Sequence, residues 1–146
     1  MARRVLAVDV GARRVGLAIS DASATLARPL ETIVVKSGAD AVDRVARRLV
    51  DLAAEDDGLA MIIVGLPVHL DGTPSAESAR VRAFITQLAT RTTLPIAVED
   101  ERLTSREAEN RLAVRERDWR KRKLKLDAAA AAIILQDYLD RTGGSG

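Results

Sequence analysis

Acidic side chains occur at three places where the surrounding pattern does not by itself call for them. They are Asp9, the triplet Glu99, Asp100 and Glu101, and Asp127. Asp9 interrupts the apolar run VLAVDV, and a lone carboxylate in such a run must be paired, protonated or bound to a metal. Carboxylate oxygens are the ligands that hard divalent cations prefer. Two such cations can activate a water and neutralise the departing oxygen of a phosphodiester, so the three places together indicate metal-dependent phosphodiester hydrolysis.

Each acid also has an ordinary explanation. An isolated acid in a strand, such as Asp9, often serves a turn or an ion pair, and an acid near a helix start, such as Asp127, is favoured by the helix dipole. The triplet follows the apolar run LPIAV, and a strand that ends in acids can simply end in solvent. The residues alone leave open whether this triplet is a solvated strand end or part of a metal site.

Basic residues are concentrated in one segment that lies just before Asp127. The chain has a formal net charge of +2, yet residues 111–125 (RLAVRERDWRKRKLK) carry eight Lys or Arg against two acids, a local net charge of +6. Such a patch is either a solvated charge run or a surface for a polyanion. Trp119 within it offers a face for stacking on a base, or else packs on the core. The candidate phosphate contacts are Arg120, Lys121, Arg122 and Lys123.

The elements that must position these residues follow from hydrophobic periodicity. Apolar and β-branched runs predict strands at 4–10, 15–20, 28–35, 60–67 and 94–98. Apolar residues at three- and four-residue spacing predict a helix from Asp40. Further helices are expected after Thr73 and Pro74, just beyond Thr104, and over 126–140, where five alanines occur in a row.

The order of these elements, β-β-β-α-β-α-β-α-α, is that of an RNase H-like domain. We therefore predict an α/β protein with a mixed five-stranded sheet, three antiparallel strands followed by parallel strands, and helices on both faces. The 146 residues suffice for one domain, 1–140, followed by a disordered tail, 141–146.

Composition excludes several other classes. There is no cysteine, so disulfides, thiolate metal sites and a cysteine nucleophile are absent. No run reaches the roughly 18 apolar residues that a membrane span needs, and we expect a cytoplasmic protein that does not bind membranes.

Four motifs together resemble one family. They are DVGARRVGLAISD (9–21), IVGLPVHLDGT (63–73), DERLTSREAE (100–109) and KLKLDAAAAAIILQDYLD (123–140). In order and spacing they resemble the YqgF (RuvX) family of RuvC-like nucleases, which are related to Holliday junction resolvases. The resemblance spans residues 4–140. It implies an RNase H-like fold, dependence on Mg²⁺ or Mn²⁺, with two ions expected, and maturation of the 5′ end of the pre-16S rRNA.

The resemblance also assigns roles to residues. It implies that Asp9, Glu101 and Asp127 are the catalytic acids and metal ligands, with Asp100 as a further candidate ligand, and that Arg14 and Arg102 contact phosphates. On this assignment Glu99 is expected to be solvated. Junction resolvases of this fold carry an acid near the position of Gly65, so the second acid must come from the neighbouring strand. His69 stands where many relatives have Asn, and its role stays open.

Other functions compete with an RNA nuclease. Cleavage of branched DNA at a Holliday junction is the alternative within the nuclease class, although RNA is favoured. A nucleic-acid-binding module that has lost activity would not need all three acids, yet all three are present. An actin-like ATPase needs two domains around its nucleotide, whereas 146 residues supply one. The sequence leaves open whether the protein is a monomer or a homodimer.

Because clustered acids disfavour one another's ionised forms, removing the charge of Asp127 is expected to leave metal-free stability equal or raised.

Overall fold

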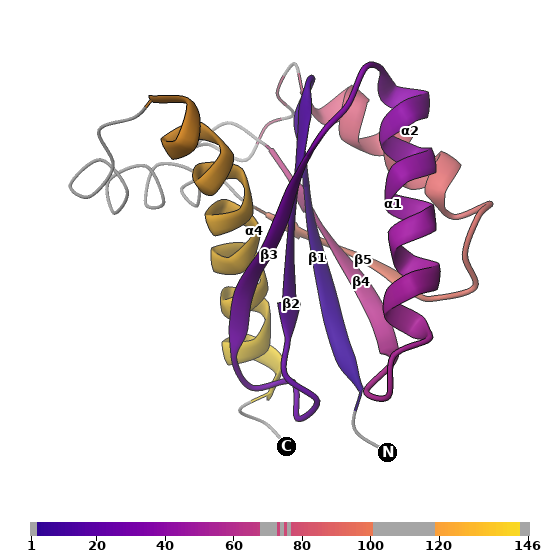
Figure 1. Ribbon diagram of the computed structural model, residues 1–146, viewed down its shortest axis with the longest axis vertical. Helices are drawn as coiled ribbons and strands as arrows, with labels where there is room; N and C mark the ends of the chain where they lie inside the picture. The colour runs from indigo at the N-terminus through magenta and orange to yellow at the C-terminus, as the bar shows by residue number, and fades with distance from the viewer. Residues whose placement is uncertain (1–2, 68–72, 74, 76, 101–118, 144–146) are drawn as a thin grey trace.

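A computed structural model shows three layers, with helix α4 on one face of a five-stranded sheet and helices α1 and α2 on the other (Figure 1). It describes residues 3–67, 73, 75, 77–100 and 119–143, and within 119–126 it describes the backbone. Glu101, Arg102, His69 and the helix expected beyond Thr104 lie outside the described residues.

The sheet has the strand order β3-β2-β1-β4-β5. Its strands are β1 (Arg4–Val10), β2 (Arg14–Ser20), β3 (Ala27–Val34), β4 (Leu59–Leu66) and β5 (Ile96–Asp100). β1, β2 and β3 are antiparallel neighbours, while β4 runs parallel to both β1 and β5. This confirms the predicted mixed sheet and its RNase H-like order. The central strand is β1, with the parallel strand β4 beside it.

Strand alternation sends successive side chains into two different cores. Leu6, Val8 and Val10 of β1 pack under α1 (Gly38–Ala53) and α2 (Ser78–Leu88). Val5 and Ala7 pack instead against α4 (Trp119–Gly143), which lies mainly across β2 and β3. Ala7 and Ala18 on this side of the sheet and Ala131 of α4 are small, so the helix can lie close to β1 and β2. Although α4 is long, no helix in the described ranges combines the length and apolar character needed to cross a membrane.

Two predicted helix starts are wrong, each for a local reason. α2 begins at Ser78, beyond the predicted cap at Thr73, because Ser75 and Ser78 both donate hydrogen bonds to the carbonyl of Pro67. α4 begins at Trp119 instead of residue 126, since the Arg, Lys and Leu residues between them favour helix. Asp127 is therefore well inside a helix, and the dipole of a helix N-terminus does not account for it.

The last two predicted boundaries also move. β5 is displaced by two residues from the predicted 94–98, because its ladder with β4 pairs Ile62 with Ile96 and continues to Leu66 with Asp100. At the C-terminus, α4 continues to Gly143, so residues 141–143 are helical where a disordered tail was predicted. Residues 144–146 lie outside the described ranges.

Candidate active site

Asp9 occupies the α4 face of the sheet near the C-terminal end of β1. Ala7, two residues earlier, packs in the core beneath α4, and alternation places Asp9 on the same face. Its side chain is half-buried, and its register partner on β2 is Gly16. Opposed residues of antiparallel strands have Cα atoms about 4.5–5.5 Å apart. A carboxylate is thus fixed beside a residue that has no side chain.

α4 packs directly against the sheet at Gly16. A Cβ atom built on Gly16 would lie 2.1 Å from the carbonyl oxygen of Asp127, 2.4 Å from its carbonyl carbon and 2.9 Å from the nitrogen of Ala128. The helix backbone at Asp127 therefore rests directly on the Gly16 backbone. Since Gly16 is also the partner of Asp9, two of the predicted catalytic acids come from segments that meet at one glycine.

Asp127 forms an ion pair with Arg14, the first residue of β2. The Arg14 Nε atom donates to Asp127 Oδ2 at 2.7 Å, and the two side chains are 27% and 26% exposed. Arg14 and Gly16 lie on the same face of β2, so Arg14 is the diagonal neighbour of Asp9 across the ladder. The sequence interpretation assigned Arg14 to substrate phosphate. In this structure, it holds one of the proposed metal ligands.

The expectation that Glu99 is solvated is wrong. Glu99 lies inside β5 opposite Gly65, and its side chain is 13% exposed and ion-paired with Arg141 of α4. The acid that the neighbouring strand places beside Gly65, among the described residues, is therefore Glu99. Sequence reasoning missed this because it ended the strand at residue 98, whereas the ladder with β4 continues through Asp100 and holds Glu99 on the face that α4 covers.

Asp100 is the last residue of β5 and pairs in register with Leu66. Alternation places it on the sheet face opposite to that of Glu99 and Asp9. Its proposed part in a metal site stays a prediction, as does that of Glu101, the next residue along the chain.

The basic patch continues into the helix that carries Asp127. Arg120, Lys121, Arg122 and Lys123 belong to the first turns of α4, and Lys123 precedes Asp127 by four residues, about 6 Å along the axis. In Figure 1 these turns lie at the upper end of α4, the end at which β1 finishes. The predicted phosphate contacts of these four residues and the stacking by Trp119 concern side chains outside the description. They stay predictions.

The described acids would supply only part of the predicted metal site. Within the described ranges, no group of three or more His, Cys, Asp or Glu side chains is placed to hold a metal ion. Asp9 and Asp127 offer only oxygen donors at one junction of strand and helix, which fits a hard divalent cation such as Mg²⁺ or Mn²⁺. With Glu101 as the third acid, they are the residues that would hold it.

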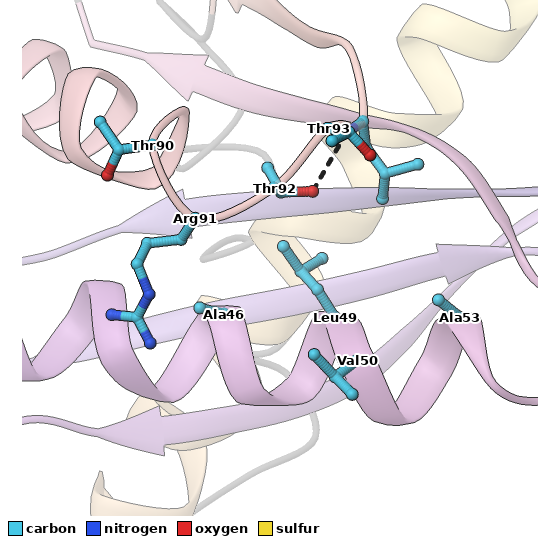
Figure 2. Close-up of a pocket in the computed structure, with 9 residues that line it drawn as sticks. Ala46, Leu49, Val50, Ala53, Thr90, Arg91, Thr92 and Thr93 are labelled. Carbon is cyan, nitrogen blue, oxygen red and sulfur yellow. Dashed lines mark hydrogen bonds between the residues drawn. The ribbon is translucent and has the colours of Figure 1, made fainter.

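A cavity of about 510 Å³ lies elsewhere, between α1 and the segment joining α2 to β5. Leu49, Val50 and Ala53 of α1 line it, and Figure 2 shows Leu49 extending toward Thr92, which accepts a hydrogen bond from the backbone N–H of Leu94. It is on the sheet face opposite Asp9 and contains no acid, so it is no part of the candidate site.

Comparison with known proteins decides the family. A family model described as "RuvX: Holliday junction resolvase" matches residues 3–141. The chain belongs to the RuvX family. A relative from Anaeromyxobacter sp. (strain K) is 38% identical over 138 residues, covering 94% of this chain and 97% of its own. One from Chloroflexus aggregans is 41% identical over 136 residues, covering 93% and 92%. Both are named "Putative pre-16S rRNA nuclease".

Solved structures support the fold of this RuvX protein. Thermus thermophilus RuvC in complex with a Holliday junction substrate matches with a TM-score of 0.56 and 17% identity, over 98% of this chain and 97% of RuvC. A second Thermus thermophilus RuvC structure matches with a TM-score of 0.51 and 18% identity, covering 96% of each chain. At this level of identity the likeness concerns the fold, which is the RNase H-like fold predicted from the order of elements.

Proposed function

We propose that this protein is a nuclease that depends on a divalent metal and hydrolyses phosphodiester bonds in RNA, in the processing of the 5′ end of pre-16S rRNA. The observation that carries the proposal is the meeting of Asp9 and Asp127 at Gly16. The relatives named above support the choice of pre-16S rRNA as the substrate.

The chain's own residues divide the work as follows. Asp9, on a rigid central strand, and Asp127, on a packed helix, would hold the metal together with Glu101. A bound divalent ion would supply activation of the attacking water and neutralisation of the departing oxygen. The basic first turns of α4 would hold the phosphate backbone. Because they belong to the same helix as Asp127, substrate binding and cleavage would share one rigid element.

The second candidate substrate is a four-way DNA junction. The family description names Holliday junction resolvase, and the fold is that of RuvC. A basic surface holds either polyanion through its phosphates, so charge alone does not distinguish RNA from DNA.

A parallel cleavage assay tests the proposal. The purified protein is incubated with pre-16S rRNA fragments, unrelated single-stranded RNA or a four-way DNA junction, each with Mn²⁺, with Mg²⁺ or with EDTA. We expect cleavage of the precursor at its 5′ side, none in EDTA, and recovery when Mg²⁺ or Mn²⁺ is restored. Full activity in chelator would contradict metal dependence, and junction cleavage without RNA cleavage would favour the second candidate.

Matched variants identify the site in the same assay. Asp9→Asn should lose most cleavage, because an amide is a poorer ligand than a carboxylate for a hard cation. Asp51→Asn removes an exposed acid from α1 on the other face and should cleave like the wild type. Equal activity in both variants would remove Asp9 from the proposed site.

A further inference from the structure

The ion pair between Arg14 and Asp127 gives one carboxylate two competing partners. Asp127 Oδ2 already accepts a hydrogen bond from Arg14, at 2.7 Å. The proposed function requires the same carboxylate to bind a divalent cation. A positively charged guanidinium beside a cation site repels the cation and lowers the affinity of the site for it. Arg14 and the divalent cation therefore compete for the Asp127 carboxylate.

Arg14 is placed so that it can exchange partners. It begins β2 directly after the turn in which the Gly11 N–H donates to the Arg14 carbonyl at 2.8 Å, so its backbone is held in place, and its side chain pairs with Asp127. The side chain is 27% exposed and lies at the sheet end that carries Asp9. An arginine in such a position can form a two-pronged contact with a phosphate.

We propose that Asp127 pairs with Arg14 in the metal-free protein, and that Arg14 becomes a phosphate-binding residue when a divalent cation replaces it at Asp127. The inference rests on the proposed function, and it adds a coupling between metal loading and substrate binding at the same site. One guanidinium thus serves as counterion to Asp127 in the metal-free protein and as a ligand to nucleic acid in the metal-loaded protein.

The test uses RNA binding in EDTA, where neither metal binding nor cleavage enters. Asp127→Ala removes the partner of Arg14, and the freed guanidinium should tighten binding of a labelled single-stranded RNA by about twofold to fivefold, the range of a partly exposed ion pair. One added phosphate contact should also steepen the dependence of log affinity on log salt by about 0.7.

A double-mutant cycle separates this mechanism from a general effect of charge. Removing any acid near the RNA strengthens binding, but that gain would persist after Arg14→Gln. If the gain comes from Arg14 released by Asp127, Asp127→Ala does not raise RNA affinity in the Arg14→Gln background. Arg13→Gln is the matched control, because Arg13 is the exposed neighbour on the turn and should leave the gain of Asp127→Ala intact.

A second measurement uses Mn²⁺ alone. Arg14→Gln removes the competing guanidinium and should raise the Mn²⁺ affinity of the RNA-free protein by up to about fivefold, while Arg13→Gln should not. Thermal melts of every variant establish that it is folded. Additive effects in the cycle, or weaker Mn²⁺ binding by Arg14→Gln, would overturn the inference while leaving a cleaving nuclease in place. Absence of RNA binding and cleavage in the wild type would instead defeat the proposed function.

Discussion

Replacing Gly16 with alanine tests the contact that brings the two acids together. The added Cβ would lie 2.1 Å from the Asp127 carbonyl oxygen, whereas ordinary van der Waals contact begins at 3.4 Å. The difference of about 1.3 Å must be absorbed by movement of backbone, since the nearest atoms belong to the main chain of α4 and no flexible side-chain end is involved. The helix therefore has to move away from β2 at Asp127.

The energetic effect can be bounded from this geometry. Overpacking a close-packed interface typically costs about 1–3 kcal/mol. The lower entropy of the unfolded chain with alanine in place of glycine offsets about 0.4–1 kcal/mol. We expect Gly16→Ala to lower the free energy of unfolding by about 1–2 kcal/mol, measured by urea denaturation without metal. It should also reduce cleavage and the stabilisation by Mn²⁺, because Asp127 is displaced from Asp9.

Gly38→Ala is the matched control. Gly38 is the first residue of α1, and a Cβ added there meets nothing within 4 Å. The same substitution at this position should leave activity unchanged and raise stability by about 0.4–1 kcal/mol. If Gly16→Ala were as stable and as active as Gly38→Ala, the close contact between α4 and β2 would not control the site.

Three further outcomes are expected. Asp127→Asn should lower the stability of the metal-free protein by up to about 1 kcal/mol, because the loss of the ion pair with Arg14 outweighs the relief of repulsion between acids. This is the opposite of the equal or raised stability expected from the sequence, and a raised melting temperature would contradict it. Four basic residues lie in the first turns of α4: Arg120, Lys121, Arg122 and Lys123. Replacing all four with Ala should weaken RNA binding and flatten the dependence of log affinity on log salt, whereas an unchanged slope would show that they do not contact phosphates. The N–H groups of Thr25 and Leu26, with Ser23, hold the pKa of Asp21 below its ordinary 3.8. The wild type should therefore exceed Asp21→Asn in free energy of unfolding by a full, constant difference above pH 3.8, and this difference should shrink as the pH falls below 3.8. Urea titrations at several pH values measure it, and a difference independent of pH would exclude this role.

Local patterns in the sequence were sufficient to predict the sheet and its order. β-branched and apolar runs identify all five strands, and the helices between the later ones require parallel crossovers. The same patterns indicated that Asp9 stands out in its apolar strand and that Asp127 belongs to the last helix. These inferences depend on side-chain type and on spacing along one element, which a single chain displays directly.

Boundaries and partners depended on the tertiary structure. Whether Glu99 is solvated or buried against α4 depends on strand register, which the ladder between β4 and β5 sets and the uniform apolar run LPIAV does not. The pairing of Arg14 with Asp127 joins residues 113 positions apart, and nothing local to either one selects the other. Nothing in the sequence around Gly16 indicates that α4 packs against it. Its missing side chain matters because a backbone distant in sequence occupies that space.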